Sequence, residues 1–155
     1  MQDSQTDVVD AVLRASRVLV SVAVRSLASV DDDVTLSQYR ALVVLASRGP
    51  QRPKELAATL AVHPSSITRL CDRLVRKRLV HRGESAQDRR EVSIRLTPQG
   101  RRLVDAVTAR RRSEIARIVD RMPARQRTAM VRALHTFGEA AEEPDDASWF
   151  TGTEA

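Results

Sequence analysis

Apolar residues recur at helical spacing along the first thirty residues of the chain. The repeating positions are Val8, Val12, Leu19, Val22 and Leu27. This spacing places them on one face of a helix, which we expect to span about residues 7–30. The acidic run at residues 31–33 interrupts the pattern, so the sequence predicts one long helix near the N-terminus.

A second helix is predicted immediately after this acidic run. Thr35 and Gln38 have the spacing of a capping box, in which each side chain accepts a hydrogen bond from the other residue's backbone N–H group. The helix is expected to continue to Ser47, because Gly49 and Pro50 then oppose further helix.

Two short helices separated by a tight turn are predicted next. Pro53 suits the first turn of a helix that reaches Leu60, because the N–H group that proline lacks has no partner at that position. After a turn at residues 61–63, another helix begins at Pro64 and ends near Lys77. Its apolar face holds Ile67, Leu70, Cys71, Leu74 and Val75, and its polar face holds Ser65, Ser66, Thr68, Arg69, Asp72, Arg73 and Arg76.

Two short strands follow, separated by a polar loop. Residues 80–82 and the alternating residues 92–96 have the pattern of an antiparallel pair, and residues 83–90 between them are too polar to pack. The predicted elements occur in the order of a winged helix-turn-helix: two short helices, a strand pair with a polar loop, and the start of a further helix. The polar loop is the predicted wing.

The last third of the chain predicts two more helices. Thr97 and Pro98 combine an N-cap residue with a proline at the first helical position, and the helix they open is expected to reach Arg121. Pro123 begins a final helix that ends near Glu142. Helices at both ends carry wide apolar stripes, yet aromatic residues make up only 3% of the chain, so an elongated monomer would cover these stripes poorly. We therefore expect a dimer in which both ends intertwine.

The predicted fold is mainly α: a winged helix-turn-helix with a small antiparallel β wing, flanked by N- and C-terminal dimerisation helices. The expected boundaries are an N-terminal dimerisation helix at 1–34, a DNA-binding domain at 35–100 and C-terminal dimerisation helices at 101–142. The acidic tail at 143–155 is expected to be flexible. The alternative is that Trp149 and Phe150 in this tail dock on the partner subunit.

The charge of the chain is concentrated in the predicted winged module. Residues 51–100 contain eleven Lys and Arg residues and five Asp and Glu residues, while the remainder holds 15 of each kind. The whole formal net charge of +6 therefore lies in this module. A basic patch confined to one segment is typical of a nucleic-acid-binding surface.

Several classes of protein are disfavoured by composition. The single cysteine and three scattered histidines provide no metal-ligand set, and five glycines include no phosphate-binding loop or nucleophile motif. We expect no catalytic residue, metal or cofactor, and therefore no enzyme. No stretch is apolar enough to cross a bilayer and the first ten residues do not resemble a signal peptide, so a cytoplasmic protein with no membrane partner is expected.

The candidate DNA-reading residues lie on the helix that begins at Pro64. The second helix of a helix-turn-helix enters the major groove, so double-stranded DNA is the expected partner. The candidates for groove contacts are Ser65, Ser66, Thr68, Arg69 and Arg73, and those for backbone contacts are Lys54, Arg76 and Arg82. The alternative is the solvated face of an ordinary amphipathic helix.

The predicted wing contains Asp88, Arg89 and Arg90. Arginine suits a narrow, electronegative minor groove, and a neighbouring carboxylate can hold its guanidinium in one pose before DNA binds. The alternative is an ordinary loop salt bridge, which contributes little at an exposed position.

Four motifs occur in sequence and at fixed spacing within residues 36–100. They are Lys54-Glu55-Leu56-Ala57, Ser65-Ser66-Ile67-Thr68-Arg69-Leu70 followed by Asp72-Arg73-Leu74, Asp88-Arg89-Arg90, and Leu96-Thr97-Pro98-Gln99-Gly100. In this succession the chain resembles the MarR (multiple antibiotic resistance regulator) family of repressors.

The resemblance implies a homodimer that binds a pseudo-palindromic operator and releases it when a small phenolic or other lipophilic effector binds. It also implies that Asp88 orients Arg90 into the minor groove and that the terminal helices form the dimer interface. The family's effector pocket lies where the first and second helices meet the fifth, which makes Arg17, Arg25, Tyr39 and Arg40 the candidate lining residues. The alternative for each is a solvated or inter-helix side chain, and the arginine run at 110–112 is interpreted as a solvated face.

Three residues need separate interpretation. Arg78 stands where the family usually has glycine, and a left-handed backbone there would cost roughly 1 kcal/mol. His63 stands where a serine cap is common and is expected to cap less well unless a phosphate completes the cap. Cys71 is expected to pack in the core, and oxidant sensing is the alternative. For the whole chain, the alternative function is a winged-helix module that recognises protein without specific DNA readout.

Overall fold

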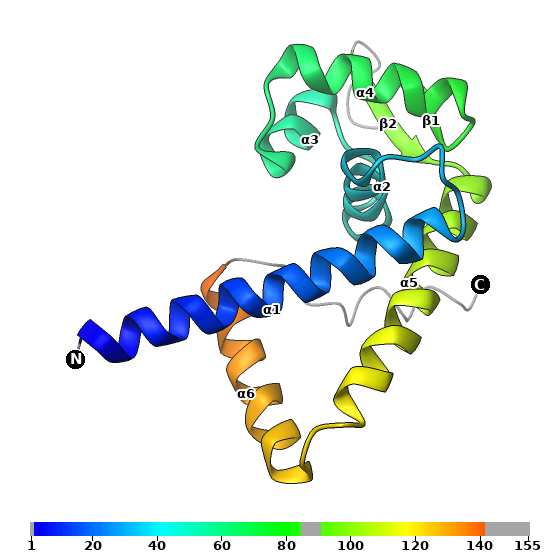
Figure 1. The fold of residues 1–155 in the computed structure, drawn as a ribbon. Helices are drawn as coiled ribbons and strands as arrows, with labels where there is room; N and C mark the ends of the chain where they lie inside the picture. The colour runs from blue at the N-terminus through cyan, green and yellow to red at the C-terminus, as the bar shows by residue number, and fades with distance from the viewer. Residues whose placement is uncertain (1, 85–90, 142–155) are drawn as a thin grey trace.

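The computed structural model describes residues 2–84 and 91–141, which form six helices and a two-stranded sheet (Figure 1). The elements are α1 (Gln2–Ala28), α2 (Leu36–Arg48), α3 (Pro53–Leu60), α4 (Pro64–Arg76), β1 (Val80–Glu84), β2 (Val92–Leu96), α5 (Pro98–Val119) and α6 (Ala124–Ala140). The predicted mainly α, winged helix-turn-helix architecture is confirmed. The wing residues Asp88, Arg89 and Arg90 lie outside the described residues, as do Trp149 and Phe150.

The bounds of β1, α1 and α5 differ from the prediction. β1 extends to Glu84 because it pairs antiparallel with β2 from Val80 opposite Leu96 as far as Glu84 opposite Val92. α1 begins at Gln2 and ends at Ala28, and the acidic run after it forms a turn in which the Asp31 carboxylate accepts a hydrogen bond from Asp33 N at 3.0 Å. α5 ends at Val119, before the predicted end at Arg121.

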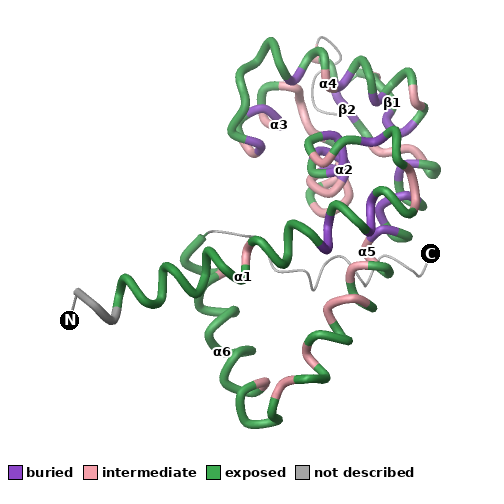
Figure 2. The backbone as a smooth tube through the Cα atoms, viewed as in Figure 1, coloured by how far each residue is buried: buried purple, intermediate pink, exposed green. Residues whose placement is uncertain are grey.

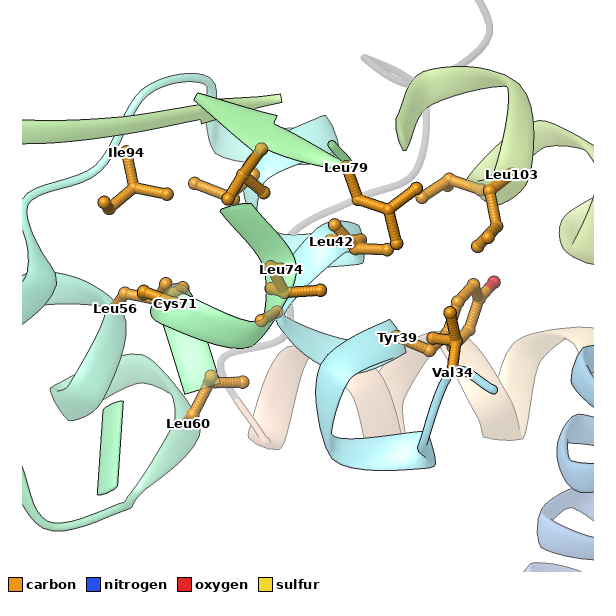
Figure 3. Close-up of a cluster of buried hydrophobic side chains, with 14 of the residues drawn as sticks. Val34, Tyr39, Leu42, Leu56, Leu60, Cys71, Leu74, Leu79, Ile94 and Leu103 are labelled. Carbon is orange, nitrogen blue, oxygen red and sulfur yellow. The ribbon is translucent and has the colours of Figure 1, made fainter. Parts of the chain in front are cut away.

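The hydrophobic core lies inside the winged module and under the first half of α5 (Figure 3). Its fully buried members include Leu42 and Leu45 of α2, Leu56 of α3, and Val104 and Val107 of α5. Burying each such aliphatic side chain contributes about 1.5–3 kcal/mol to stability. Helix α2 passes through the middle of this core, so the three helices of the DNA-reading module and the start of α5 form one packed unit.

Helix α4 shows the predicted amphipathic pattern with one exception. Ile67, Cys71 and Leu74 are buried and Leu70 is half-buried, as predicted, but Val75 is 38% exposed. Val75 follows Leu74 by one residue, which rotates it about 100° around the helix and away from the core.

The helix starts are capped as the sequence predicted. Thr35 Oγ1 accepts from Gln38 N, Gln38 Oε1 accepts from Thr35 N, and both distances are 3.2 Å. At the start of α5, Thr97 Oγ1 accepts from Gly100 N at 3.0 Å. These caps satisfy backbone N–H groups that would otherwise have no partner in the first helical turn.

The turn after α4 brings the chain back against the start of α5. Arg78 has φ +59°, the left-handed conformation considered from the sequence. Thr97 then bonds to this turn twice: its hydroxyl donates to Arg78 O at 2.7 Å and its N–H to Leu79 O at 3.1 Å. Gly100 lies so close that an added Cβ would be 2.1 Å from Leu79 O, so only glycine fits there without a backbone shift.

Two apolar surfaces remain exposed in the single chain (Figure 2). The first lies on the N-terminal two thirds of α1 and includes Val8, Val9, Val12, Leu13, Val18 and Leu19. The second lies on α6, whose described residues include none that is buried, and it contains Met130, Val131, Leu134 and Phe137. Among the helices described, none is both long and apolar enough to cross a membrane.

Replacing Gly100 by alanine is expected to lower the free energy of unfolding by about 1–3 kcal/mol, because the added methyl group overlaps the backbone carbonyl of Leu79. Urea unfolding followed by circular dichroism at fixed protein concentration measures the change. Gly138→Ala is the matched control, since no atom lies within 4 Å of its added Cβ, and it should raise helix stability by up to about 1 kcal/mol. Equal stability of the Gly100 variant and wild type would contradict the packing argument.

Candidate nucleic-acid interface

Helix α4 presents its polar face to solvent at the edge of the molecule farthest from α6 (Figure 1). The predicted groove-contact residues are all exposed: Ser65, Ser66, Thr68, Arg69 and Arg73. Arg69 and Arg73 are one helical turn apart, so both lie on the same side of α4. This face therefore combines short hydroxyl side chains at its N-terminal end with guanidinium groups farther along.

The first turn of α4 is capped by His63. The ring nitrogen Nδ1 accepts a hydrogen bond from Ser65 N at 3.2 Å, and the same nitrogen lies 2.8 Å from Ser65 Oγ. The imidazole thus caps the helix by itself, without the phosphate that the sequence analysis had invoked. One turn later, the Thr68 hydroxyl donates to Pro64 O at 3.2 Å.

The predicted backbone-contact residues occupy three different elements. Lys54 is exposed on the first turn of α3, and Arg76 is exposed at the end of α4. Arg82 on β1 is bonded to α4, because its Nη2 donates to Asp72 Oδ1 at 2.8 Å. This ion pair is half-exposed and contributes little to stability, but it fixes where one guanidinium lies beside the helix.

The base of the wing is attached to α3 by an arginine that the sequence analysis missed. Arg52 Nη1 donates to Glu91 Oε2 at 2.7 Å, while its Nε and Nη2 donate to Glu55 Oε1 at 2.9 and 2.7 Å. These bonds hold the pKa of the Glu55 carboxyl below its usual value, chiefly through the Arg52 side chain. Glu91 directly follows the predicted wing arginines, so the end of the wing is tied to α3.

A backbone contact reinforces this attachment. Gln51 N donates to Ile94 O at 2.9 Å and Ile94 N donates to Gln51 O at 2.8 Å, which pairs the segment before α3 with β2. The signal available in the sequence was the Arg52 and Glu55 spacing at a helix start. Nothing in the periodicity predicted a pairing partner at Gln51, because an isolated bridge involves one residue.

A cavity of about 330 Å³ lies where α1 and α2 approach α5. Tyr39 and Arg40 line it, whereas Arg17 and Arg25 do not and fit the alternative of a solvated or inter-helix side chain. Arg17 is exposed on α1, and Arg25 Nη2 is instead bonded to Glu114 Oε2 of α5 at 2.9 Å, which draws it away from the cavity.

Two further arginines, Arg48 and Arg111, also line the cavity, together with the hydroxyl side chains Ser47 and Thr59. The interpretation of residues 110–112 as a solvated face is wrong for Arg111, whose Nε is buried and has no hydrogen-bond partner among the described residues. The apolar part of the lining consists of Leu19, Val20, Ala23, Leu36, Val43 and Val44. The volume and mixed lining are within the range of small-molecule sites.

Cys71 is fully buried among core side chains, which confirms the predicted packing role. Burial raises the pKa of the thiol, because the thiolate would lose its hydration. The protonated thiol is the less reactive form, so this position is unsuited to oxidant sensing.

Comparison with known sequences identifies relatives of the winged module. Residues 32–91 match the model of the MarR family. The chain is 36% identical over 73 residues to the uncharacterized HTH-type transcriptional regulator YhbI of Bacillus subtilis, covering 47% of each protein. It is 34% identical over 84 residues to the HTH-type transcriptional repressor MdtR of the same species, covering 54% of each. The chain thus spans about half the length of the curated relatives it matches.

Comparison with solved structures extends the similarity to nearly the whole chain. RV1404 from Mycobacterium tuberculosis superposes with a TM-score of 0.85 at 45% sequence identity, covering 92% of this chain and 97% of that one. A MarR family protein from Bacillus stearothermophilus superposes with a TM-score of 0.79 over 92% of this chain and 99% of that one. Its sequence identity is 22%, so this second likeness supports the fold alone.

Proposed function

This chain belongs to the MarR family, and we propose that it is a transcriptional repressor that binds a pseudo-palindromic DNA operator as a homodimer. The observation that carries the proposal is the exposed polar face of α4. Its hydroxyl and guanidinium groups suit base edges and phosphates in the major groove, and all five groove candidates are exposed. The concentration of positive charge in residues 51–100 supports the same partner.

The wing supplies the second proposed contact. We assign Arg90 to the minor groove with Asp88 as its orienting carboxylate, on the basis of the sequence motif and the family resemblance. The bond from Arg52 to Glu91 supports this assignment, because it anchors the residue that follows Arg90. A side chain next to an anchored residue loses less conformational freedom on binding than a side chain on an unattached loop.

The DNA proposal is tested by fluorescence anisotropy with a duplex from immediately upstream of the protein's own start codon. Arg90→Ala is expected to weaken binding by about 1–3 kcal/mol, and higher salt should weaken wild-type binding steeply because phosphate contacts release counterions. Arg125→Ala, which removes a cation from α6, is the matched control and should bind like wild type. If wild type prefers neither this duplex nor any genomic fragment over random DNA, the module recognises protein instead.

The exposed surfaces of α1 and α6 support the proposed homodimer. Both are continuous apolar stripes at the two ends of the chain, and a two-fold axis lets identical patches cover one another. Large exposed apolar patches on a water-soluble surface mark contact sites. In the dimer, the α4 of each chain would face one half of the operator.

Leu134→Glu is expected to convert the dimer to monomer at micromolar concentration, because Leu134 is 52% exposed in the single chain and lies within the α6 stripe. Sedimentation velocity measures the change. Val62→Glu introduces the same charge at another exposed apolar position, in the turn before α4, and should remain dimeric. A Leu134 variant that sediments like wild type would place the interface elsewhere.

We also propose that the cavity between α1, α2 and α5 binds a small phenolic or lipophilic effector that lowers DNA affinity. The apolar wall suits a ring or alkyl group, and the unpaired Nε of Arg111 offers a donor to its oxygen. The cavity is lined by α2 of the winged module and by α1 and α5, so a ligand there can alter how these helices pack.

Calorimetric titration with 4-hydroxybenzoate and a neutral phenol probes this site. Arg111→Met is expected to weaken binding of the anionic probe about ten- to hundredfold, since a charged hydrogen bond worth about 1.5–3 kcal/mol is lost. Arg17→Met, on the exposed face of α1 outside the cavity, should leave the affinity unchanged. Equal losses in both variants would argue against binding in this cavity.

A further inference from the structure

Two side chains in the first turn of α4 are hydrogen-bonded to each other beside the proposed DNA surface. His63 Nδ1 lies 2.8 Å from Ser65 Oγ and 3.2 Å from Ser65 N. Both residues are exposed, and Ser65 is one of the candidates for groove contacts. The direction of the bond between these side chains decides what Ser65 can offer to a base.

The backbone bond fixes that direction. A backbone N–H can only donate, so Nδ1 of His63 must be an acceptor and carry no proton. The neutral imidazole then has its proton on Nε2. Because the unprotonated Nδ1 can only accept, we assign the Ser65 hydroxyl as the donor in the 2.8 Å contact, so that the one lone pair of Nδ1 is shared by the hydroxyl and the backbone N–H group of Ser65. Its proton is therefore engaged inside the protein, and only its oxygen lone pairs remain for DNA.

We infer that His63 determines the base preference of Ser65 by setting the polarity of its hydroxyl group; this inference rests on the proposed function. With its proton engaged, Ser65 Oγ can accept from the major-groove amino groups of adenine and cytosine. It has no proton to offer to the acceptor atoms of guanine and thymine. Ser65 thus reads an amino group, although serine by itself can donate or accept.

Protonation of His63 reverses this polarity. An imidazolium has N–H groups at both nitrogens, so Nδ1 becomes a donor, the Ser65 oxygen becomes its acceptor, and the bond from Ser65 N to Nδ1 is lost. The hydroxyl proton is then released toward DNA and suits guanine O6, guanine N7 or thymine O4. Thr68 shows no such reversal, because its hydroxyl donates to a backbone carbonyl that does not titrate.

Helices α2, α3 and α4 around His63 carry no other imidazole. Residues 56–62, which include the last turn of α3, contain no ionisable side chain. The charged groups on these helices are Arg40 and Arg48 on α2, Lys54 and Glu55 on α3, and Arg69, Asp72, Arg73 and Arg76 on α4; Arg48 donates to Thr59 Oγ1 at 3.1 Å. Carboxylate, ammonium and guanidinium groups have ordinary pKa values outside the range from pH 5 to pH 8, whereas imidazole has its ordinary pKa inside it. His81 on β1 is the other exposed imidazole of the module and requires a control.

The test uses a duplex that wild-type protein selects at pH 8 from a random-sequence pool. Each base pair of one half-site is then changed to the other three, and affinities are measured by anisotropy at pH 8 and pH 5. At one position, wild type at pH 8 should prefer adenine or cytosine over guanine or thymine by about three- to tenfold, the equivalent of one neutral hydrogen bond. At pH 5 this preference should disappear or reverse.

Three variants separate this mechanism from a general effect of pH. In His63→Asn, the carboxamide oxygen can cap the helix and accept from Ser65 at either pH, so the amino-base preference should persist at pH 5. Ser65→Ala should lose the preference at both pH values. His81→Gln should retain the wild-type change with pH.

A wild-type preference that is the same at pH 8 and pH 5 would overturn the inference, as would a pH effect that survives in His63→Asn. Ser65→Ala with unchanged base preferences would also overturn it. In each of these results the protein still binds a selected sequence, so the proposed function stands. If the pool yields no preferred sequence, the proposed function fails and the inference fails with it.

Discussion

The close backbone contact between the turn after α4 and the start of α5 determines where the DNA-reading helix lies. Leu79 O accepts from Thr97 N at 3.1 Å, and Gly100 permits the approach because it has no side chain. This contact joins three parts of the chain: the end of α4, both strands of the wing and the helix that leads out of the module. The first strand pair, Val80 with Leu96, and the first residue of α5, Pro98, lie directly beside this contact.

The sequence predicted the parts of the fold that depend on local chemistry. Caps at Thr35 and Thr97 and proline at the first helical position are signals carried by neighbouring residues, and each was confirmed. The strand at 92–96 was also confirmed, but its burial does not alternate as predicted, because Val92 is exposed and Ser93 is buried. Contacts that join distant residues could not be predicted in this way. The bridge between Gln51 and Ile94 and the ion pair between Arg25 and Glu114 depend on how elements pack, which periodicity does not specify.

The candidate site shows the same difference between positions set by local geometry and positions set by packing. The hydroxyl and arginine positions on α4 followed from helical geometry, and all are exposed as that geometry requires. The cavity was predicted less well, because residues 110–112 read as a charged run although one of them turns inward. A side chain at a helix crossing is buried or exposed according to the angle of that crossing. The assignments to Asp88, Arg89 and Arg90 remain predictions, since these residues lie outside the described ranges.

The burial of Cys71 has a practical consequence for spectroscopy. It is the only cysteine of the chain and it is fully enclosed by the core, so the native surface offers no competing thiol. A single cysteine introduced on the polar face of α4 can therefore be spin-labelled or dye-labelled without first removing a native residue. In a symmetric dimer each label has an identical counterpart on the other chain, so one substitution allows the distance between the two α4 helices to be measured.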